Sequence, residues 1–182
     1  MTDVNTSLAG NAIKCMDLMH RILSAWLVLS LIAAFLPSSA DDAQLRLPFT
    51  EITVPINSAR WACAVVIFFA GFIVCAILKQ LRELCVFLEQ SEYLQVVLSY
   101  PALATLGAPW QRAFVGYGLA FIQYSVGYQL FSPMPPMFGS APDIGLAFLY
   151  SGPMFLVAWE LRDWQRRIKL PGAVPTSKNI PA

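Results

Sequence analysis

Charged side chains are scarce in this sequence. Only 13% of its 182 residues are charged, and 57% are hydrophobic. Soluble domains carry about 25% charged residues, so about half of the usual charge is missing. The mean hydropathy is +0.59. Because the charge is missing in long blocks rather than evenly, the composition predicts an integral membrane protein and leaves no room for a separate soluble domain.

Residues that carry chemistry are scarce as well. The chain has one histidine and four cysteines, with no CxxC pair and no Cys/His cluster, so we expect no metal site. No GxSxG, HExxH or phosphate-loop motif is present. We expect no catalytic residues and no cofactor. The net charge of +1 gives no indication of a nucleic-acid partner.

Four apolar segments are long enough to cross a bilayer as helices, since about 20 residues at ~1.5 Å each cover a ~30 Å hydrocarbon core. They are Leu18 to Leu36, Trp61 to Leu78, Ala113 to Phe131 and Ile144 to Leu161. The sequence therefore predicts an all-α integral membrane protein with four transmembrane helices. We expect a single membrane domain over residues 1–170, and a disordered cytoplasmic tail over the proline-rich residues 171–182.

The basic residues predict how the chain is threaded. Ten of the twelve fall before the first span or in its first turn, between the second and third spans, or after the fourth: Lys14, Arg21, Lys79, Arg82, Arg112, Arg162, Arg166, Arg167, Lys169 and Lys178. Only Arg46 and Arg60 lie on the other side. By the positive-inside rule both termini are predicted to be cytoplasmic, and we expect a multi-pass protein of the bacterial inner membrane.

The N-terminal region allows two readings. Residues 1–15 are small and polar, and we expect them to be loosely ordered. The apolar run that follows ends at Pro37, and Ser38-x-Ala40 resembles a signal-peptide cleavage site, so cleavage after Ala40 is an alternative. We interpret this segment as an uncleaved first span.

The connections between spans also carry patterns. Apolar positions continue beyond Leu78 with helical spacing, so the second helix is predicted to extend into the cytoplasm to about Gln90. A short helix from Glu92 to Leu98 should follow. On the outer side, apolar and polar residues alternate on both sides of residues 50–51, which predicts two short extended pieces in the outer loop.

The third span has two distinct faces. One is an aromatic stripe, a possible surface for a ligand or a partner, with a lipid-facing or packing surface as the plainer alternative: Phe114, Tyr117, Phe121, Tyr124, Tyr128 and Phe131. The other consists of small residues and one amide, and it is predicted to pack closely on a neighbouring helix: Gly116, Ala120, Gln123 and Gly127. We expect Gln123 to bond to Tyr150 or Ser151 of the fourth span.

These features favour a non-catalytic membrane subunit that assembles, anchors or scaffolds partner membrane helices in a larger complex or a homo-oligomer. One alternative is a small channel or pore-forming effector lined by Gln123, Tyr124 and Ser125. A second alternative is a lipid- or quinone-binding protein that uses the aromatic stripe. Membrane lipids are expected partners, with their headgroups at the basic turn that follows the fourth span: Arg166, Arg167 and Lys169.

Overall fold

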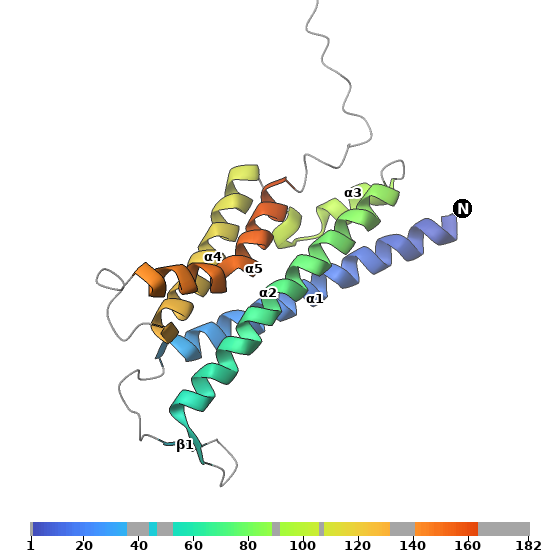
Figure 1. The fold of residues 1–182 in the computed structure, drawn as a ribbon. Coiled ribbons are helices and arrows are strands. Elements are labelled where there is room, and N and C mark those ends of the chain that lie inside the picture. The colour runs from blue at the N-terminus through green and yellow to red at the C-terminus, as the bar shows by residue number, and fades with distance from the viewer. Residues whose placement is uncertain are drawn as a thin grey trace, which may run out of the picture.

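The computed structural model is helical apart from two short strands (Figure 1). It describes residues 2–35, 44–46, 53–88, 92–105, 108–131 and 141–163. The elements in chain order are α1 (Thr2–Phe35), β1 (Gln44–Arg46), β2 (Thr53–Pro55), α2 (Ile56–Phe87), α3 (Tyr93–Ser99), the 3₁₀ turn η1 (Leu103–Thr105), α4 (Pro109–Phe131) and α5 (Ala141–Asp163).

The four long helices pack as two pairs. Helices α1 and α2 lie side by side along most of their length, and α4 packs against α5 in the most extensive contact of the fold (Figure 1). The pairs are joined mainly through α2 and α5. At one end of α2, Arg60 Nη2 donates a hydrogen bond to the backbone oxygen of Gln129 in α4, at 2.6 Å. Towards its other end, Arg82 Nη1 lies 2.6 Å from Glu160 Oε2 of α5.

Within the described residues, three helices are long and apolar enough to cross a membrane, judged by length and composition alone. The candidate segments are Val4–Phe35 in α1, Ile56–Phe87 in α2 and Pro142–Arg162 in α5. They carry many large apolar side chains on their exposed faces, such as Leu31 and Phe69. Exposed apolar surface on this scale is expected where lipid replaces water. The chain is thus compatible with a multi-pass membrane protein.

The segment expected as the third span forms a helix, α4, but is not among these three candidates. It is 23 residues long, so its length suffices. Its composition is the reason: Gln123, Gln129, the glycines and the tyrosines lower the mean hydropathy of residues 113–131, and Arg112 directly precedes that segment. Burial offsets part of this polarity, because Arg112 and Gln123 are both completely buried.

The expectation that residues 1–15 are loosely ordered is wrong. Helix α1 begins at Thr2 and runs for 34 residues. Its first half is anchored by a buried stripe with helical spacing that belongs to the main apolar cluster: Ala9, Ala12, Met16 and Met19. The same cluster includes Cys85 near the end of α2 and Leu94 in α3. Small side chains bury little area each, yet they allow helices to approach closely, so low hydrophobicity did not prevent ordering.

Two further expectations can be compared with the structure. The long second helix is confirmed as α2, with 32 residues, and the short helix after it as α3, one residue later than expected. Between α1 and α2, β1 and β2 pair antiparallel with Leu45 opposite Val54. The extended pieces therefore pair with each other. The basic turn after the fourth span and the tail of residues 171–182 lie outside the described residues.

Candidate functional site

The small face of α4 lies against α5. A Cβ atom added at Gly116 would lie 2.8 Å from Cα of Ala158, and one added at Gly127 would lie 2.6 Å from Cδ1 of Tyr150. Ala120, between the two glycines, is completely buried. Higher numbers in α4 meet lower numbers in α5, so the two helices are antiparallel. Any side chain larger than hydrogen at either glycine would push the helices apart.

Two hydrogen bonds hold this contact, one between α4 and α5 and one between α5 and α2. Gln123 Nε2 donates to the backbone oxygen of Tyr150 at 2.9 Å, and the Tyr150 hydroxyl donates to the backbone oxygen of Ala64 at 2.6 Å. The sequence predicts a bond from Gln123 to Tyr150 or Ser151, and it is formed with Tyr150 through the backbone. Gln123 Oε1 is buried without a hydrogen-bond partner among the described residues. It lies on the side of Gly71 in α2, whose added Cβ would be 3.6 Å away.

The aromatic stripe does not form one continuous surface. Phe114, Tyr117 and Phe121 are exposed, whereas Tyr128 is only 1% exposed. Phe131 packs edge-on against Trp61 of α2, with ring centroids 5.8 Å apart. Phe131 also lines a cavity of about 360 Å³ near the strand end of the bundle, and it is the single member of the stripe that does so. Helical spacing alone places these rings in one stripe, because it does not show where neighbouring helices cover them.

The exposed side chains of α4 lie on the face opposite its small residues. This outer face of α4 consists of Trp110, Phe114, Tyr117, Gly118, Phe121 and Gln129. A Cβ added at Gly118 would meet nothing within 4 Å. The exposed face of α1 is different, since aliphatic residues such as Leu27 and Leu31 predominate there, whereas the exposed face of α2 mixes aliphatic side chains such as Val66 with rings such as Phe69. The outer face of α4 thus combines large rings with a glycine and an amide.

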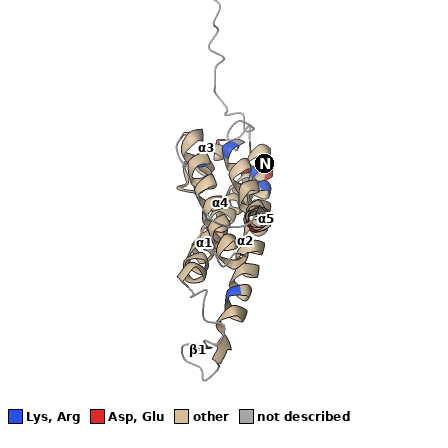
Figure 2. Cartoon of the chain, turned by 60° about the vertical axis from the view of Figure 1, so that its left-hand side comes forward, with Lys and Arg blue, Asp and Glu red and all other residues tan. Residues whose placement is uncertain are grey.

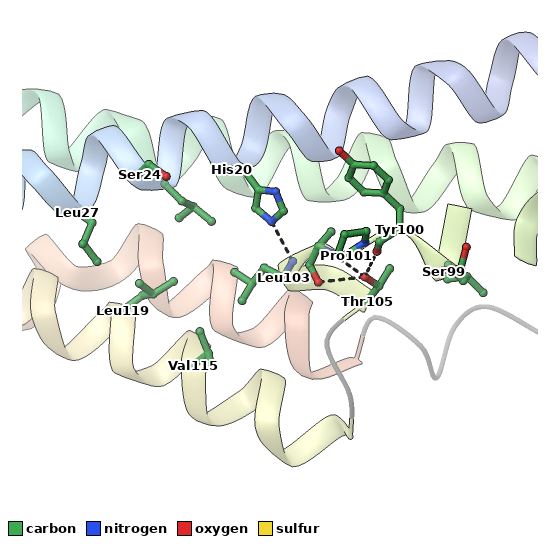
Figure 3. A pocket seen from close by; sticks show the side chains of 13 residues that line it. His20, Ser24, Leu27, Ser99, Tyr100, Pro101, Leu103, Thr105, Val115 and Leu119 are labelled. Atoms are coloured by element: carbon green, nitrogen blue, oxygen red, sulfur yellow. Dashed lines mark hydrogen bonds between the residues drawn. The ribbon is translucent and has the colours of Figure 1, made fainter. Parts of the chain in front are cut away.

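A cavity of about 570 Å³ lies between α1, α4 and the segment that contains α3 and η1 (Figure 3). Two contacts fix that segment to α1. The Tyr100 hydroxyl donates a hydrogen bond to Asp17 Oδ1, and the Leu103 backbone N–H donates to His20 Nε2 at 3.3 Å. The hydrogen bond to the Asp17 carboxylate raises the pKa of Tyr100 above its ordinary value.

Sequence reasoning did not identify this cavity. The available signal was weak: His20, Ser24 and Leu27 share one face of α1 by their spacing, but nothing in the sequence shows that α3 and η1 fold back to cover it. Within the described residues, no group of three or more His, Cys, Asp and Glu side chains could hold a metal ion.

Comparison with known proteins gives no match: no family, no curated protein and no solved structure is detectably similar to this chain.

Proposed function

We propose that the protein is a four-span integral membrane subunit, with both termini in the cytoplasm, that associates with other membrane helices through the outer face of α4. On this proposal it assembles or anchors a larger complex or a homo-oligomer in the bacterial inner membrane. The observation that carries the proposal is the chemistry of that face.

The packing of α4 supports its placement as a membrane span, the third of the four. The close contacts at Gly116 and Gly127 are eleven residues apart, which corresponds to about 16 Å of helix, or half of the ~30 Å hydrocarbon core. A helix that lies antiparallel along α5 over this distance shares its depth. If α5 crosses the membrane, α4 therefore crosses it with α5.

The distribution of charge supports the orientation. Figure 2 shows that the Lys and Arg residues of the described helices gather at the end of the bundle that holds the N-terminus and α3. Arg60 lies towards the opposite end, in the second turn of α2. The basic end is the cytoplasmic end by the positive-inside rule.

The outer face of α4 supports association with protein rather than contact with lipid alone. Lipid tails favour aliphatic side chains, and they gain nothing from a glycine or an amide. A glycine between two rings, by contrast, lets a second helix approach closely while the rings pack on either side of it. Gly118 lies between Phe114 and Phe121 in this way. The channel alternative is less well supported, because Gln123 is buried against α5.

The test is a single substitution. Gly118→Leu fills the outer face without touching the rest of the fold, so the chain should keep its melting temperature and lose its assembly. Subunit number is counted by stepwise photobleaching of the labelled full chain in liposomes, and co-purified proteins are identified after mild detergent extraction. Gly145→Leu is the matched control, since Gly145 also has open space around it. A wild-type chain that is monomeric and free of co-purified protein would contradict the proposal.

A further inference from the structure

We propose that the cavity beside His20 binds an uncharged lipid with a carbonyl oxygen at its polar end. The inference rests on the membrane placement proposed above and adds a ligand to it. The cavity volume of about 570 Å³ lies within the range of roughly 300–1,000 Å³ that small-molecule sites occupy. Its walls come from three separate parts of the chain, so the site exists only in the folded protein.

The lining of the cavity changes character from one end to the other. Figure 3 shows His20, Tyr100 and Thr105 towards one end, and Leu27 and Leu119 towards the other. Both hydroxyls at this end are already engaged, since that of Tyr100 donates to Asp17 and that of Thr105 donates to backbone oxygens of its own turn. An amphiphile fits this gradient in one orientation, with its polar end beside His20 and its tail between α1 and α4.

That orientation matches the proposed direction of α1. The helix enters the membrane from the cytoplasm, so Leu27, seven residues after His20, lies about 10 Å deeper in the bilayer. A lipid of the inner leaflet likewise has its polar end towards the cytoplasm and its tail towards the midplane. The cavity is thus aligned with the lipids that surround it.

The polar end of the cavity favours an uncharged hydrogen-bond acceptor. Because Nε2 of His20 accepts the Leu103 N–H, the neutral ring carries its own proton on Nδ1, where it is a donor. Ser24 adds a hydroxyl to the same wall. None of the described residues that line the cavity is Lys, Arg, Asp or Glu. An anionic headgroup would find no counter-charge there, whereas a carbonyl oxygen would find a donor.

The chain has a single histidine, so all histidine ring signals in an NMR spectrum come from His20. The full chain, labelled with ¹⁵N in the histidine ring, is purified in dodecyl maltoside, a detergent that has no carbonyl group. It is titrated in separate arms with decylubiquinone and with dioctanoylglycerol. We expect a saturable shift of the His20 ring signals in one arm or both, and the stronger arm identifies a quinone or a glyceride as the ligand.

Leu119→Trp should fill the apolar end of the cavity and weaken binding about tenfold or more, while leaving His20 in place. Leu156→Trp on the exposed face of α5 is the matched control and should bind as the wild type does. If Leu119→Trp loses helix content, Val115→Phe takes its place. A third arm uses phosphatidylglycerol, which carries an anionic headgroup. Absence of a saturable shift with the two uncharged probes would overturn the proposal, as would equal binding by the filled variant or a response to phosphatidylglycerol alone. None of these outcomes would bear on the membrane topology, which reporter fusions test separately.

Discussion

Gln123 of α4 donates a hydrogen bond to the backbone oxygen of Tyr150 in α5 at 2.9 Å, and both residues are buried. Tyr150 in turn donates to Ala64 of α2. One tyrosine therefore connects three helices near the middle of α4 and α5. Polar bonds of this kind are individually weak in membrane proteins, about 0.6 kcal/mol on average, so close packing around them carries most of the stability.

The close packing predicts a strong effect at Gly116. Gly116→Leu should destabilise the fold by about 1–3 kcal/mol, because the added side chain would overlap Ala158 of α5. Thermal unfolding of the detergent-solubilised chain measures the change. Gly145→Leu adds the same side chain in open space. Its free energy of unfolding should stay within about 0.5 kcal/mol of the wild-type value. An equal loss in both variants would show that α4 and α5 are not packed as described.

Gln123→Leu should have little effect on stability, in contrast to Gly116→Leu. The substitution removes the hydrogen bond to Tyr150, but it also removes the unpaired buried oxygen Oε1. The two terms oppose each other, so the net change should stay within about 1 kcal/mol. The same variant in liposomes tests the channel alternative. Ion flux that depends on Gln123 would favour that alternative over the proposed function.

The ion pair between Arg82 and Glu160 should contribute more than an exposed pair. The two side chains are only 21% and 15% exposed. Glu160→Gln leaves the guanidinium partly buried without its counter-charge and should cost about 1–3 kcal/mol, between the values for surface and fully buried pairs. The reversed pair, Arg82→Glu with Glu160→Arg, should recover part of this loss in a double-mutant cycle. A cycle with no coupling would show that the pair is not formed.

The contact between Tyr100 and Asp17 predicts a loss of order at high pH. The folded state raises the pKa of Tyr100 above the ordinary value of 10.0, chiefly through the hydrogen bond to Asp17. The contact therefore stabilises the fold fully below pH 10 and is lost as the pH rises through the higher folded value. The chain has six tyrosines, so the tyrosinate absorbance of Tyr100→Phe is subtracted from that of the wild type. Asp17→Asn should shift the difference curve to lower pH. No shift would mean that the hydrogen bond to Asp17 does not raise the pKa of Tyr100.

Much of the helical framework could be predicted from the sequence, because hydropathy and helical spacing are local properties. The spacing of Leu78, Leu81 and Cys85 was sufficient to extend the second helix beyond its apolar core. The sequence analysis did not predict a helix in the first half of α1. Ala9 and Ala12 are small, and low hydropathy is typical of disordered segments. Their periodic spacing with Met16 was the better indicator.

The sites were harder to predict because they depend on which helices meet. The sequence showed that Gly116 and Gly127 share a face, but it did not show that α5 is the neighbour. It also gave no sign that Arg112 is buried or that η1 covers His20. Contacts between residues more than eighty positions apart, such as Asp17 with Tyr100, leave no local pattern.

The proposed topology depends most on whether α4 crosses the membrane as the third of four spans, and the side of the membrane on which the chain emerges after α5 tests this directly. The measurement uses a reporter fused after Ala182 that is active only in the cytoplasm, compared with one active only in the periplasm. Four spans with a cytoplasmic N-terminus predict activity of the cytoplasmic reporter alone. If α1, α2 and α5 cross the membrane and α4 does not, the chain emerges on the other side, and activity of the periplasmic reporter would contradict the account.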